Sequence, residues 1–229
     1  MVRYYNSWAE IGPEQIDSDE EAAVTTVFRY QRKSYYLHLQ MEYCQSDLKL
    51  FLDNRKILDL NEARSIFTQI LNGIEYIHNK GIIHRDLKPA NILISDNLNV
   101  KITDFGVGVI YDNLISDNNY SAYIGTEPYS SPEQTLGKVC SFSTDIYSMG
   151  IILFELLHIF NTSMERIVEI RKLKDPDSKY LVLPIIKHMI NYKPSMRPSI
   201  KHLKIMFSEI DNEFVICRDI VWSIIFNLF

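Results

Sequence analysis

The pattern of hydrophobic and polar positions changes once along the chain, close to residue 48. Before that point, runs of β-branched and aromatic residues predict strands over residues 3–10, 24–30 and 35–43. An acidic, turn-rich stretch at residues 12–21 separates the first two runs and is typical of a solvated loop. The chain is therefore expected to begin with a small sheet.

From residue 48 onward the hydrophobic positions follow helical spacing. Between residues 61 and 79 they recur every three or four positions on one face, and Gly81 follows as a typical helix stop. Residues 143–158 are apolar nearly all round, which is typical of a helix at the centre of a core. No linker separates this region from the strands. Three more helices are predicted over residues 164–173, 180–191 and 199–210.

Composition narrows the possible functions. The 229 residues are 46% hydrophobic and 23% charged, as in an ordinary soluble globular protein. The net charge is −5 and no basic stripe is present in the sequence, so we expect no nucleic-acid partner. The three cysteines form no disulfide or zinc pattern and no signal peptide is evident, so a cytoplasmic location is expected. The apolar run at residues 220–229 is about half the length of a membrane span, which favours a buried terminal helix and no membrane partner.

Residues 84–91 carry the strongest chemical signal, reading His-Arg-Asp-Leu-Lys-Pro-Ala-Asn, and Asp104-Phe105-Gly106 follows thirteen residues after Asn91. Phosphoryl transfer has a loose transition state, so its catalyst must position groups and neutralise charge. Asp86 can orient a hydroxyl and accept its proton, and Lys88 can hold a γ-phosphate. Asn91 and Asp104 offer the hard oxygen ligands that Mg²⁺ prefers. The apolar residues 92–94 and 100–102 are predicted to form a rigid hairpin that holds these groups.

These motifs resemble the catalytic core of the eukaryotic protein kinases of the serine/threonine type, over about residues 2–203. The resemblance implies an α+β, protein-kinase-like fold, mostly the helical C-terminal lobe with a remnant of the N-terminal lobe sheet. It also implies transfer of the ATP γ-phosphate to a protein hydroxyl, with ATP and Mg²⁺ as cofactors. The expected divisions are an N-terminal lobe remnant at 1–45, the C-terminal lobe at 46–210 and an apolar extension at 211–229.

Four further residues match structural positions of that family. Glu133 is expected to pair with Arg197, and Asp145 to brace the catalytic loop. His84 could be a metal ligand or a base, but in this context it is expected to pack beneath Phe105.

Arg85, beside the predicted catalytic aspartate, implies regulation. An arginine there can pair with a phosphate on the activation segment and order it. Ser121 is the nearest acceptor, so we hypothesise that its phosphorylation activates the protein. Thr126 is instead expected to hydrogen-bond near Asp86 and set the substrate site.

Several segments are similar to the kinases of the alpha subunit of translation initiation factor 2, namely residues 2–10, 39–44, 131–134 and 162–166 with the acidic insertion. In that family the last segment opens a helix that docks the substrate. The resemblance therefore implies this initiation factor subunit as the partner, docking near Thr162–Arg166.

The same resemblance assigns an adenine pocket. Met41 would be the gatekeeper, Glu42 and Cys44 the hinge that touches adenine, and Leu93 the floor of the pocket. An ordinary core role for Met41 and Leu93 remains open.

Three parts of the family pattern have no match in the sequence, namely the glycine-rich loop, the lysine on the third strand and its glutamate partner on the following helix. There is no Gly-x-Gly-x-x-Gly, and the first lysine, Lys33, follows what resembles the fourth strand and so cannot be the nucleotide lysine. One hypothesis is a serine/threonine kinase with a lost or reduced N-terminal lobe. The other is a catalytically impaired lobe mimic that binds and inhibits a related kinase, and a gene fragment is a third reading. The intact catalytic residues favour the first hypothesis and the missing glycine-rich loop favours the second.

Overall fold

The computed structural model describes residues 4–11, 35–105, 109–110, 126–175 and 182–209. The chain divides into two compact units, a smaller one at residues 2–43 and a larger one from residue 44 onward. The predicted strand at 24–30, the loop at 12–21 and the terminal helix at 220–229 lie outside the described residues.

The smaller unit is an antiparallel ribbon of β1 (Tyr4–Ile11) and β2 (Tyr35–Met41). Trp8 lies opposite His38 in the register, and their rings stack with centroids 5.0 Å apart. His38 Nε2 also lies 3.2 Å from the carboxylate of Glu10. The strands predicted over 3–10 and 35–43 are therefore present, shifted by a residue or two at their ends.

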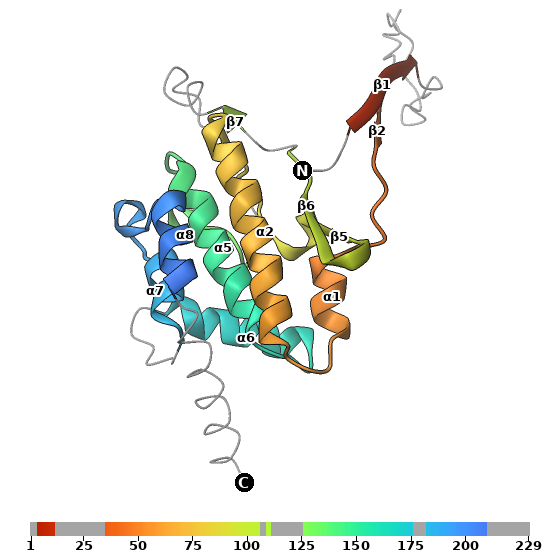
Figure 1. The fold of residues 1–229 in the computed structure, drawn as a ribbon. Helices are drawn as coiled ribbons and strands as arrows, with labels where there is room; N and C mark the ends of the chain where they lie inside the picture. The colour runs from red at the N-terminus through yellow and green to blue at the C-terminus, as the bar shows by residue number, and fades with distance from the viewer. Residues whose placement is uncertain (1–3, 12–34, 106–108, 111–125, 176–181, 210–229) are drawn as a thin grey trace, which may run out of the picture. The chain divides into compact units, whose positions relative to one another are not determined.

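The core of the larger unit is formed by two long helices, α2 (Leu60–Asn79) and α5 (Phe142–Leu156), which lie side by side (Figure 1). Helix α2 buries one face, as its spacing predicts, whereas α5 is buried at every residue from 144 to 156. Burial of so much apolar surface from both helices is the main favourable contribution to folding. Helix α2 begins where the Asp59 side chain accepts from the backbone N–H groups of Asn61 and Glu62, and ends before Gly81, whose φ is +72°.

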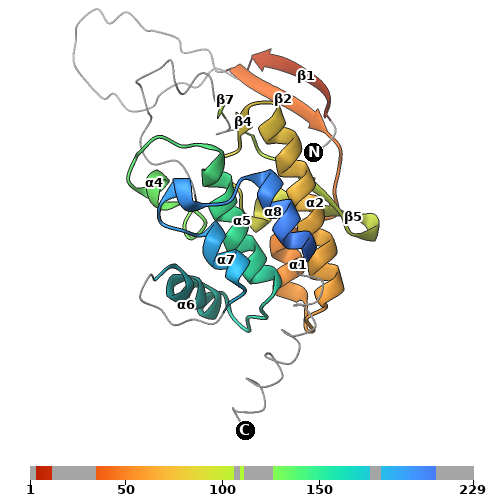
Figure 2. The same cartoon turned by 60° about the vertical axis from the view of Figure 1, so that its left-hand side comes forward.

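Shorter helices surround this pair. In the turned view, α7 and α8 lie beside α5 and α2, and α6 lies at one end of α5 (Figure 2). Helices α6 and α8 match the predicted ranges closely, but α7 is shorter than the predicted 180–191 and starts at a proline, a residue suited to the first turn. Helices α1 and α4 are too short to have been predicted from periodicity. The bounds are α1 Leu48–Asn54, α4 Pro132–Thr135, α6 Ser163–Lys174, α7 Pro184–Met189 and α8 Ile200–Glu209.

Two small sheets carry the loops of interest. Strands β5 (Ile92–Ser95) and β6 (Asn99–Ile102) form the predicted hairpin, in which Ile92 pairs with Ile102, and β3 (Ser46–Asp47) joins the free edge of β5. Strand β4 (Ile82–Ile83) pairs with β7 (Val109–Ile110). Short 3-10 turns occur at Pro89–Asn91, Asp96–Leu98 and Pro194–Met196.

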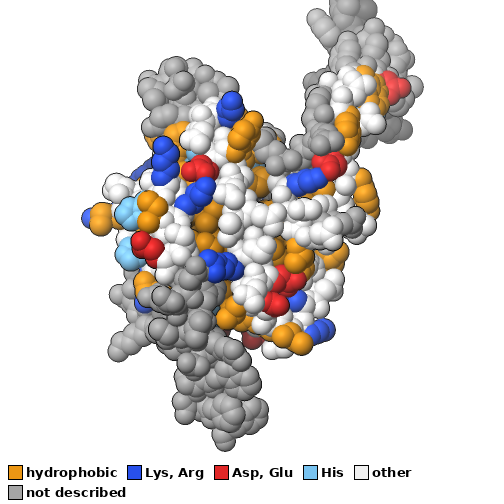
Figure 3. Space-filling view, in the orientation of Figure 1, with side chains coloured by type: hydrophobic (Ala, Val, Ile, Leu, Met, Phe, Trp, Pro, Cys, Tyr) orange, Lys and Arg blue, Asp and Glu red, His pale blue; other side chains and the backbone are white. Residues whose placement is uncertain are grey.

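On the face of the larger unit shown in Figure 3, Lys and Arg side chains are interspersed with Asp and Glu side chains. Among the helices in the described ranges, none combines the length and apolar composition that crossing a membrane requires.

The contact between α5 and α7 leads to a testable prediction. A Cβ added at Gly150 would lie 2.7 Å from Ile190 Cγ2 and 2.9 Å from Met189 Cβ, atoms held close to the α7 backbone. We expect Gly150→Ala to lower the free energy of unfolding by about 1–3 kcal/mol through overpacking, measured by urea denaturation.

Gly73→Ala is the matched control, since it makes the same chemical change in the interior of α2. Its Cβ would meet only the Ile102 side chain, closest at the terminal Cδ1 atom at 2.7 Å, which can turn aside. We expect a smaller loss at Gly73, and equal losses at both positions would contradict the overpacking explanation.

Candidate active site

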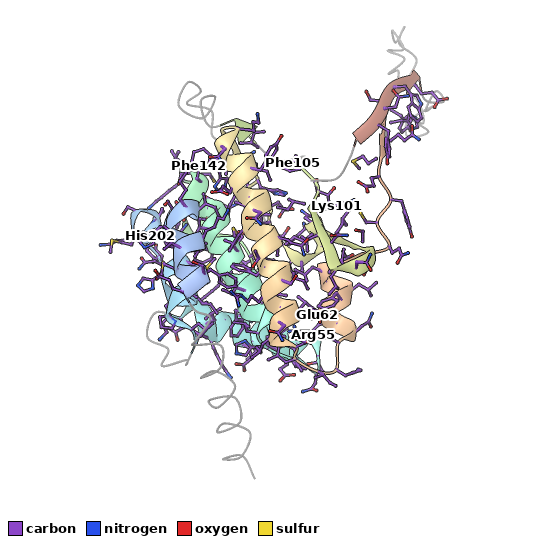
Figure 4. All side chains as sticks on the ribbon, viewed as in Figure 1. Arg55, Glu62, Lys101, Phe105, Phe142 and His202 are labelled. Atoms are coloured by element: carbon purple, nitrogen blue, oxygen red, sulfur yellow. The ribbon has the colours of Figure 1, made fainter. Side chains whose placement is uncertain are left out.

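The loop at residues 84–91 is held in place by a buried carboxylate. Asp145, completely buried near the start of α5, accepts hydrogen bonds from the backbone N–H groups of His84 and Arg85, both at 3.0 Å. The His78 ring nitrogen Nε2 lies 2.8 Å from the same carboxylate, and the Phe142 ring packs 4.8 Å from His78 near the end of α2 (Figure 4). Arg85 has a φ of +66°, a backbone conformation that side chains disfavour. The two bonds from Asp145 therefore stabilise a turn that the sequence alone does not favour.

His84 joins this loop to the segment that follows β6. Its ring nitrogen Nε2 lies 2.9 Å from the carbonyl oxygen of Thr103, and its ring centroid lies 4.9 Å from that of Phe105. His84 is fully buried, so both contacts are shielded from water. The structure thus places His84 against Phe105 and uses its ring as a link between two loops.

The carboxylate of Asp86 is the centre of a compact polar cluster. Lys88 Nζ donates to Asp86 Oδ2 at 2.7 Å, and Thr126 Oγ1 donates to Asp86 Oδ1 at 2.7 Å. Lys88 Nζ also donates to Thr126 Oγ1 at 2.8 Å. The amide of Asn91 donates to the Asp86 carbonyl oxygen at 2.9 Å and to Oδ2 at 3.3 Å. Four residues from the sequence prediction are therefore brought together around one carboxylate, in a partly buried setting where charges interact more strongly than in water.

Asn91 and Asp104, the predicted Mg²⁺ ligands, lie on adjoining chain segments. The N–H of Thr103 donates to the Asn91 carbonyl oxygen at 3.0 Å, which extends the β5–β6 pairing to the residue before Asp104. Asp104 is exposed and has a φ of +62°. Because the Asn91 amide nitrogen is used by Asp86, its Oδ1 atom is the one available as a ligand. An amide oxygen and a carboxylate from adjoining chain segments fit the preference of Mg²⁺ for hard oxygen ligands.

Glu133 and Arg197 form a two-pronged ion pair, with Arg197 Nη1 and Nη2 donating to the carboxylate oxygens at 2.7 and 2.8 Å. The Thr144 hydroxyl donates to Glu133 Oε1 at 3.0 Å. Burial alone would raise the pKa of Glu133, but the hydrogen bonds and charge of Arg197 hold it below its ordinary value. This pair anchors α4 to the loop that precedes α8, and breaking it from one side would leave a buried charge without a partner.

Segment 126–134 is attached to the catalytic loop through Gln134 as well as Thr126. Gln134 Nε2 donates to the Arg85 carbonyl oxygen at 2.7 Å. This contact was not predicted, and neither was the one between His78 and Asp145. No spacing in the sequence pairs these residues, because both contacts join positions far apart in the chain.

Glu155 is a further site residue that sequence reasoning missed. Completely buried at the end of α5, it accepts hydrogen bonds from the Tyr129 hydroxyl on both carboxylate oxygens at 3.0 Å. Arg166 Nε lies 3.4 Å from Glu155 Oε1. Burial raises the pKa of Glu155 to about 7. One signal could have found it, because Glu155 and Asp145 are the two charged residues in a helix that is otherwise apolar nearly all round.

The remaining predicted residues are placed as follows. Met41 ends β2 and is 48% exposed, and Glu42 belongs to the same smaller unit. Cys44 and Leu93 are half-buried residues of the larger unit. The adenine-binding roles of these four stay predictions. Ser121 lies outside the described residues.

Thr162 and Arg166 frame the predicted docking segment at the start of α6. The Thr162 hydroxyl accepts from the backbone N–H of Glu165 at 3.1 Å and so caps the helix. Met164 is 70% exposed, whereas Arg166 is turned inward and only 7% exposed. The segment therefore presents an apolar side chain outward on a helix that is fixed from within.

Comparison with known proteins identifies the class of this fold and site. The family model described as the protein kinase domain matches residues 14–206. The chain belongs to that family.

Similarity to individual protein kinases indicates which members of the family the chain resembles. The chain is 34% identical to the interferon-induced, double-stranded RNA-activated protein kinase of Mus musculus, over 86% of this chain and 38% of the relative. It is 36% identical to eukaryotic translation initiation factor 2-alpha kinase 3 of Bos taurus, over 71% of this chain and 16% of the relative. It is 33% identical to eIF-2-alpha kinase GCN2 of Schizosaccharomyces pombe, over 88% of this chain and 14% of the relative. The chain thus spans less than two fifths of the length of these curated relatives, and it is similar to eIF2-alpha kinases as the sequence predicted.

The buried carboxyl of Glu155 makes folding pH-dependent. Its pKa is about 7 in the folded protein against an ordinary 4.5, so the folded protein holds a proton that the unfolded chain releases above pH 4.5. The contribution of Glu155 to stability is therefore largest at low pH, falls as the pH rises toward 7 and is constant above it. The charged and titratable groups around it are Tyr129, Arg166, Lys49, Asp53 and Arg55.

We expect the unfolding free energy of the wild type, relative to Glu155→Gln, to decrease by about 2–3 kcal/mol between pH 5 and pH 7.5. Denaturant titrations of both proteins at the two pH values measure this difference. A difference that is the same at both values would contradict a raised pKa at Glu155.

Proposed function

We propose that this chain is a serine/threonine protein kinase that transfers the γ-phosphate of ATP to a hydroxyl of the alpha subunit of translation initiation factor 2. One observation carries the proposal, the cluster in which Asp86 is contacted by Lys88, Thr126 and Asn91. Folding does not require three polar side chains around a partly buried carboxylate, because such groups cost free energy to remove from water. Their arrangement suits a reaction that needs positioned donors and acceptors.

The roles follow from this geometry. Asp86 would orient the substrate hydroxyl and accept its proton as the hydroxyl oxygen bonds to the γ-phosphorus. The bond from that phosphorus to the β–γ bridging oxygen then breaks, and ADP leaves. The Lys88 ammonium, 2.7 Å from Asp86, would hold the γ-phosphate beside the attacking hydroxyl. Thr126 would fix Asp86 from the opposite side through its hydrogen bond to Oδ1.

Asn91 and Asp104 would hold Mg²⁺ through their side-chain oxygens. When bound, the metal ion neutralises charge on the ATP phosphates. The residues of the chain contribute by fixing these oxygens on adjoining segments, which the pairing of Thr103 with Asn91 supports. Pre-organised ligands of this kind need no rearrangement during the reaction.

The proposed substrate rests on similarity and on α6. Two of the relatives are named as kinases of the initiation factor 2 alpha subunit. The exposed side chain of Met164 at the start of α6 supports docking of that protein near Thr162–Arg166.

A second candidate is a non-catalytic relative that binds and inhibits another kinase. The 229 residues contain no Gly-x-Gly-x-x-Gly, the motif that covers the ATP phosphates in protein kinases, and this favours the second candidate.

One experiment separates the two candidates. Purified residues 1–229 are incubated with Mg²⁺, radiolabelled ATP and the initiation factor subunit. We expect label on the substrate, with Asp86→Asn lowering the rate about 10²- to 10⁴-fold because the general base is lost. Asp104→Asn should remove the metal-dependent turnover, while Glu209→Gln, at an exposed position on α8, serves as the control and should not change it. Equal rates in Asp86→Asn and wild type would overturn the proposal, and no ATP binding with inhibition of a full-length kinase would favour the second candidate.

We further propose that phosphorylation of Ser121 activates the enzyme by pairing with Arg85. Ser121→Ala should lower activity, and phosphopeptide mapping of the active wild type should find phosphate on Ser121. Undiminished activity in the variant would rule out this regulation.

A further inference from the structure

Resting on the kinase function proposed above, we propose that Arg166 and Lys174 of α6 are positioning residues that hold segment 126–131 so that Thr126 stays at Asp86. The docking helix and the catalytic loop would then act as one coupled unit. The contacts that carry this inference lie in the larger unit, among residues that the structure describes.

The first attachment is at the start of α6. Arg166 Nε lies 3.4 Å from Glu155, whose two carboxylate oxygens accept from the Tyr129 hydroxyl. A second nitrogen of Arg166 pairs with Asp53 of α1. Arg166 is therefore joined to segment 126–131 through one shared carboxylate and is held on its other side by α1.

The shared carboxylate sits on a rigid support. Arg55, which lies beside Glu62 at the start of α2 (Figure 4), donates to the carbonyl oxygens of Glu155, Leu156 and His158. These are carbonyl groups at the end of α5, where helices leave oxygens without intrahelical partners. Because Arg55 satisfies them, the backbone at Glu155 is held in position, and its carboxylate gives Arg166 and Tyr129 a common anchor.

The second attachment is at the last residue of α6. Lys174 Nζ donates to the carbonyl oxygen of Ser130 at 3.3 Å and lies 5.6 Å from the centre of the Tyr147 ring. Lys174 is half-buried, and this burial lowers the pKa of its ammonium. The two ends of α6 are therefore attached to neighbouring residues of the same segment, at Ser130 directly through Lys174 and at Tyr129 through Glu155.

Only a short stretch of chain separates these attachments from the catalytic carboxylate. The Tyr129 N–H donates to the Thr126 carbonyl oxygen at 2.8 Å and closes a tight turn. The Ser148 hydroxyl donates to the Tyr129 carbonyl oxygen at 3.0 Å. Thr126 then contacts Asp86 and Lys88. A displacement at Tyr129 or Ser130 would therefore reach Asp86 across one turn.

A contribution to stability alone does not explain why the side chains of Arg166 and Lys174 are turned inward. Helix α6 is already anchored by the buried side chains of Ile170 and Leu173. Moving a guanidinium and an ammonium out of water costs free energy, and buried ion pairs are weak evidence for stability. Their value here is geometric, because each fixes a specific atom of segment 126–131.

The test replaces each positioning side chain by a neutral one of similar length, Arg166→Met and Lys174→Met. Lys172→Met is the matched control on the same helix, since Lys172 forms an exposed ion pair with Glu169 and, among the residues described, no contact with segment 126–131. Hydrogen–deuterium exchange followed by mass spectrometry is measured on residues 1–229 without substrate. We expect residues 126–131 to exchange about tenfold faster in both variants, with α2 unchanged and the control like wild type.

A double variant, Glu155→Gln with Arg166→Met, guards against misfolding caused by an unpaired buried carboxylate. If Arg166→Met unfolds, the double variant and Lys174→Met decide the question. Unchanged exchange at residues 126–131 would overturn the inference. So would faster exchange that appears equally in α6 and α2, because that pattern reports a general loss of stability.

Turnover gives an independent readout if the chain is a kinase. Misplacing Thr126 should lower kcat about tenfold in both variants, with the KM for ATP unchanged. The exchange measurement needs no activity, so an inactive chain would overturn the proposed function while leaving the coupling to be decided by exchange alone. A kinase with normal kcat in both variants would overturn the coupling and leave the function standing.

Discussion

The carboxylate of Asp145 is the interaction on which the catalytic loop depends. It lies inside the molecule on a fully buried stretch of helix, yet it accepts hydrogen bonds from two consecutive backbone N–H groups and contacts a histidine. A buried carboxylate is stable only when such partners surround it, and the disfavoured backbone at Arg85 persists only when its N–H is held. The buried Asp145 carboxylate and the backbone turn at Arg85 therefore stabilise each other, and this fixes the position of Asp86, the next residue in the loop.

Helix α5 provides a second support of the same kind at its opposite end. Glu155 follows Asp145 by ten residues, which is about 15 Å along a helix axis. The first carboxylate holds the catalytic loop, and the second holds Tyr129 and Arg166. Because the apolar surface of α5 is packed against α2 and α7 throughout, the spacing between the two carboxylates is rigid. One buried helix thus sets the distance between the loop that carries Asp86 and the Tyr129 side chain of segment 126–131.

Most elements of the fold could be predicted because their signals are local. The one-sided spacing of residues 61–79 and the apolar run of 143–158 each correspond to a helix with nearly the same ends. The sequence did not predict helices α1 and α4 or the paired strands β4 and β7. Segments of two to seven residues contain too few positions to show a period. In the site, the spacing of Asp86, Lys88 and Asn91 identified residues that the fold does bring together. That spacing could not indicate Glu155, whose importance comes from its contacts with Tyr129 and Arg166.

The sequence by itself determined the longer helices, the hairpin at 92–102 and the chemical types of the residues in the catalytic loop, because these depend on groups close together in the chain. Through the family resemblance it also implied that Asp145 braces the catalytic loop. Only the tertiary structure decided which groups contact Asp145 and Glu155. Tyr129 and Arg166 both contact Glu155, and Gln134 contacts Arg85, although these residues belong to distant segments of the chain. Such contacts follow from how helices pack, and no spacing along the chain encodes them directly.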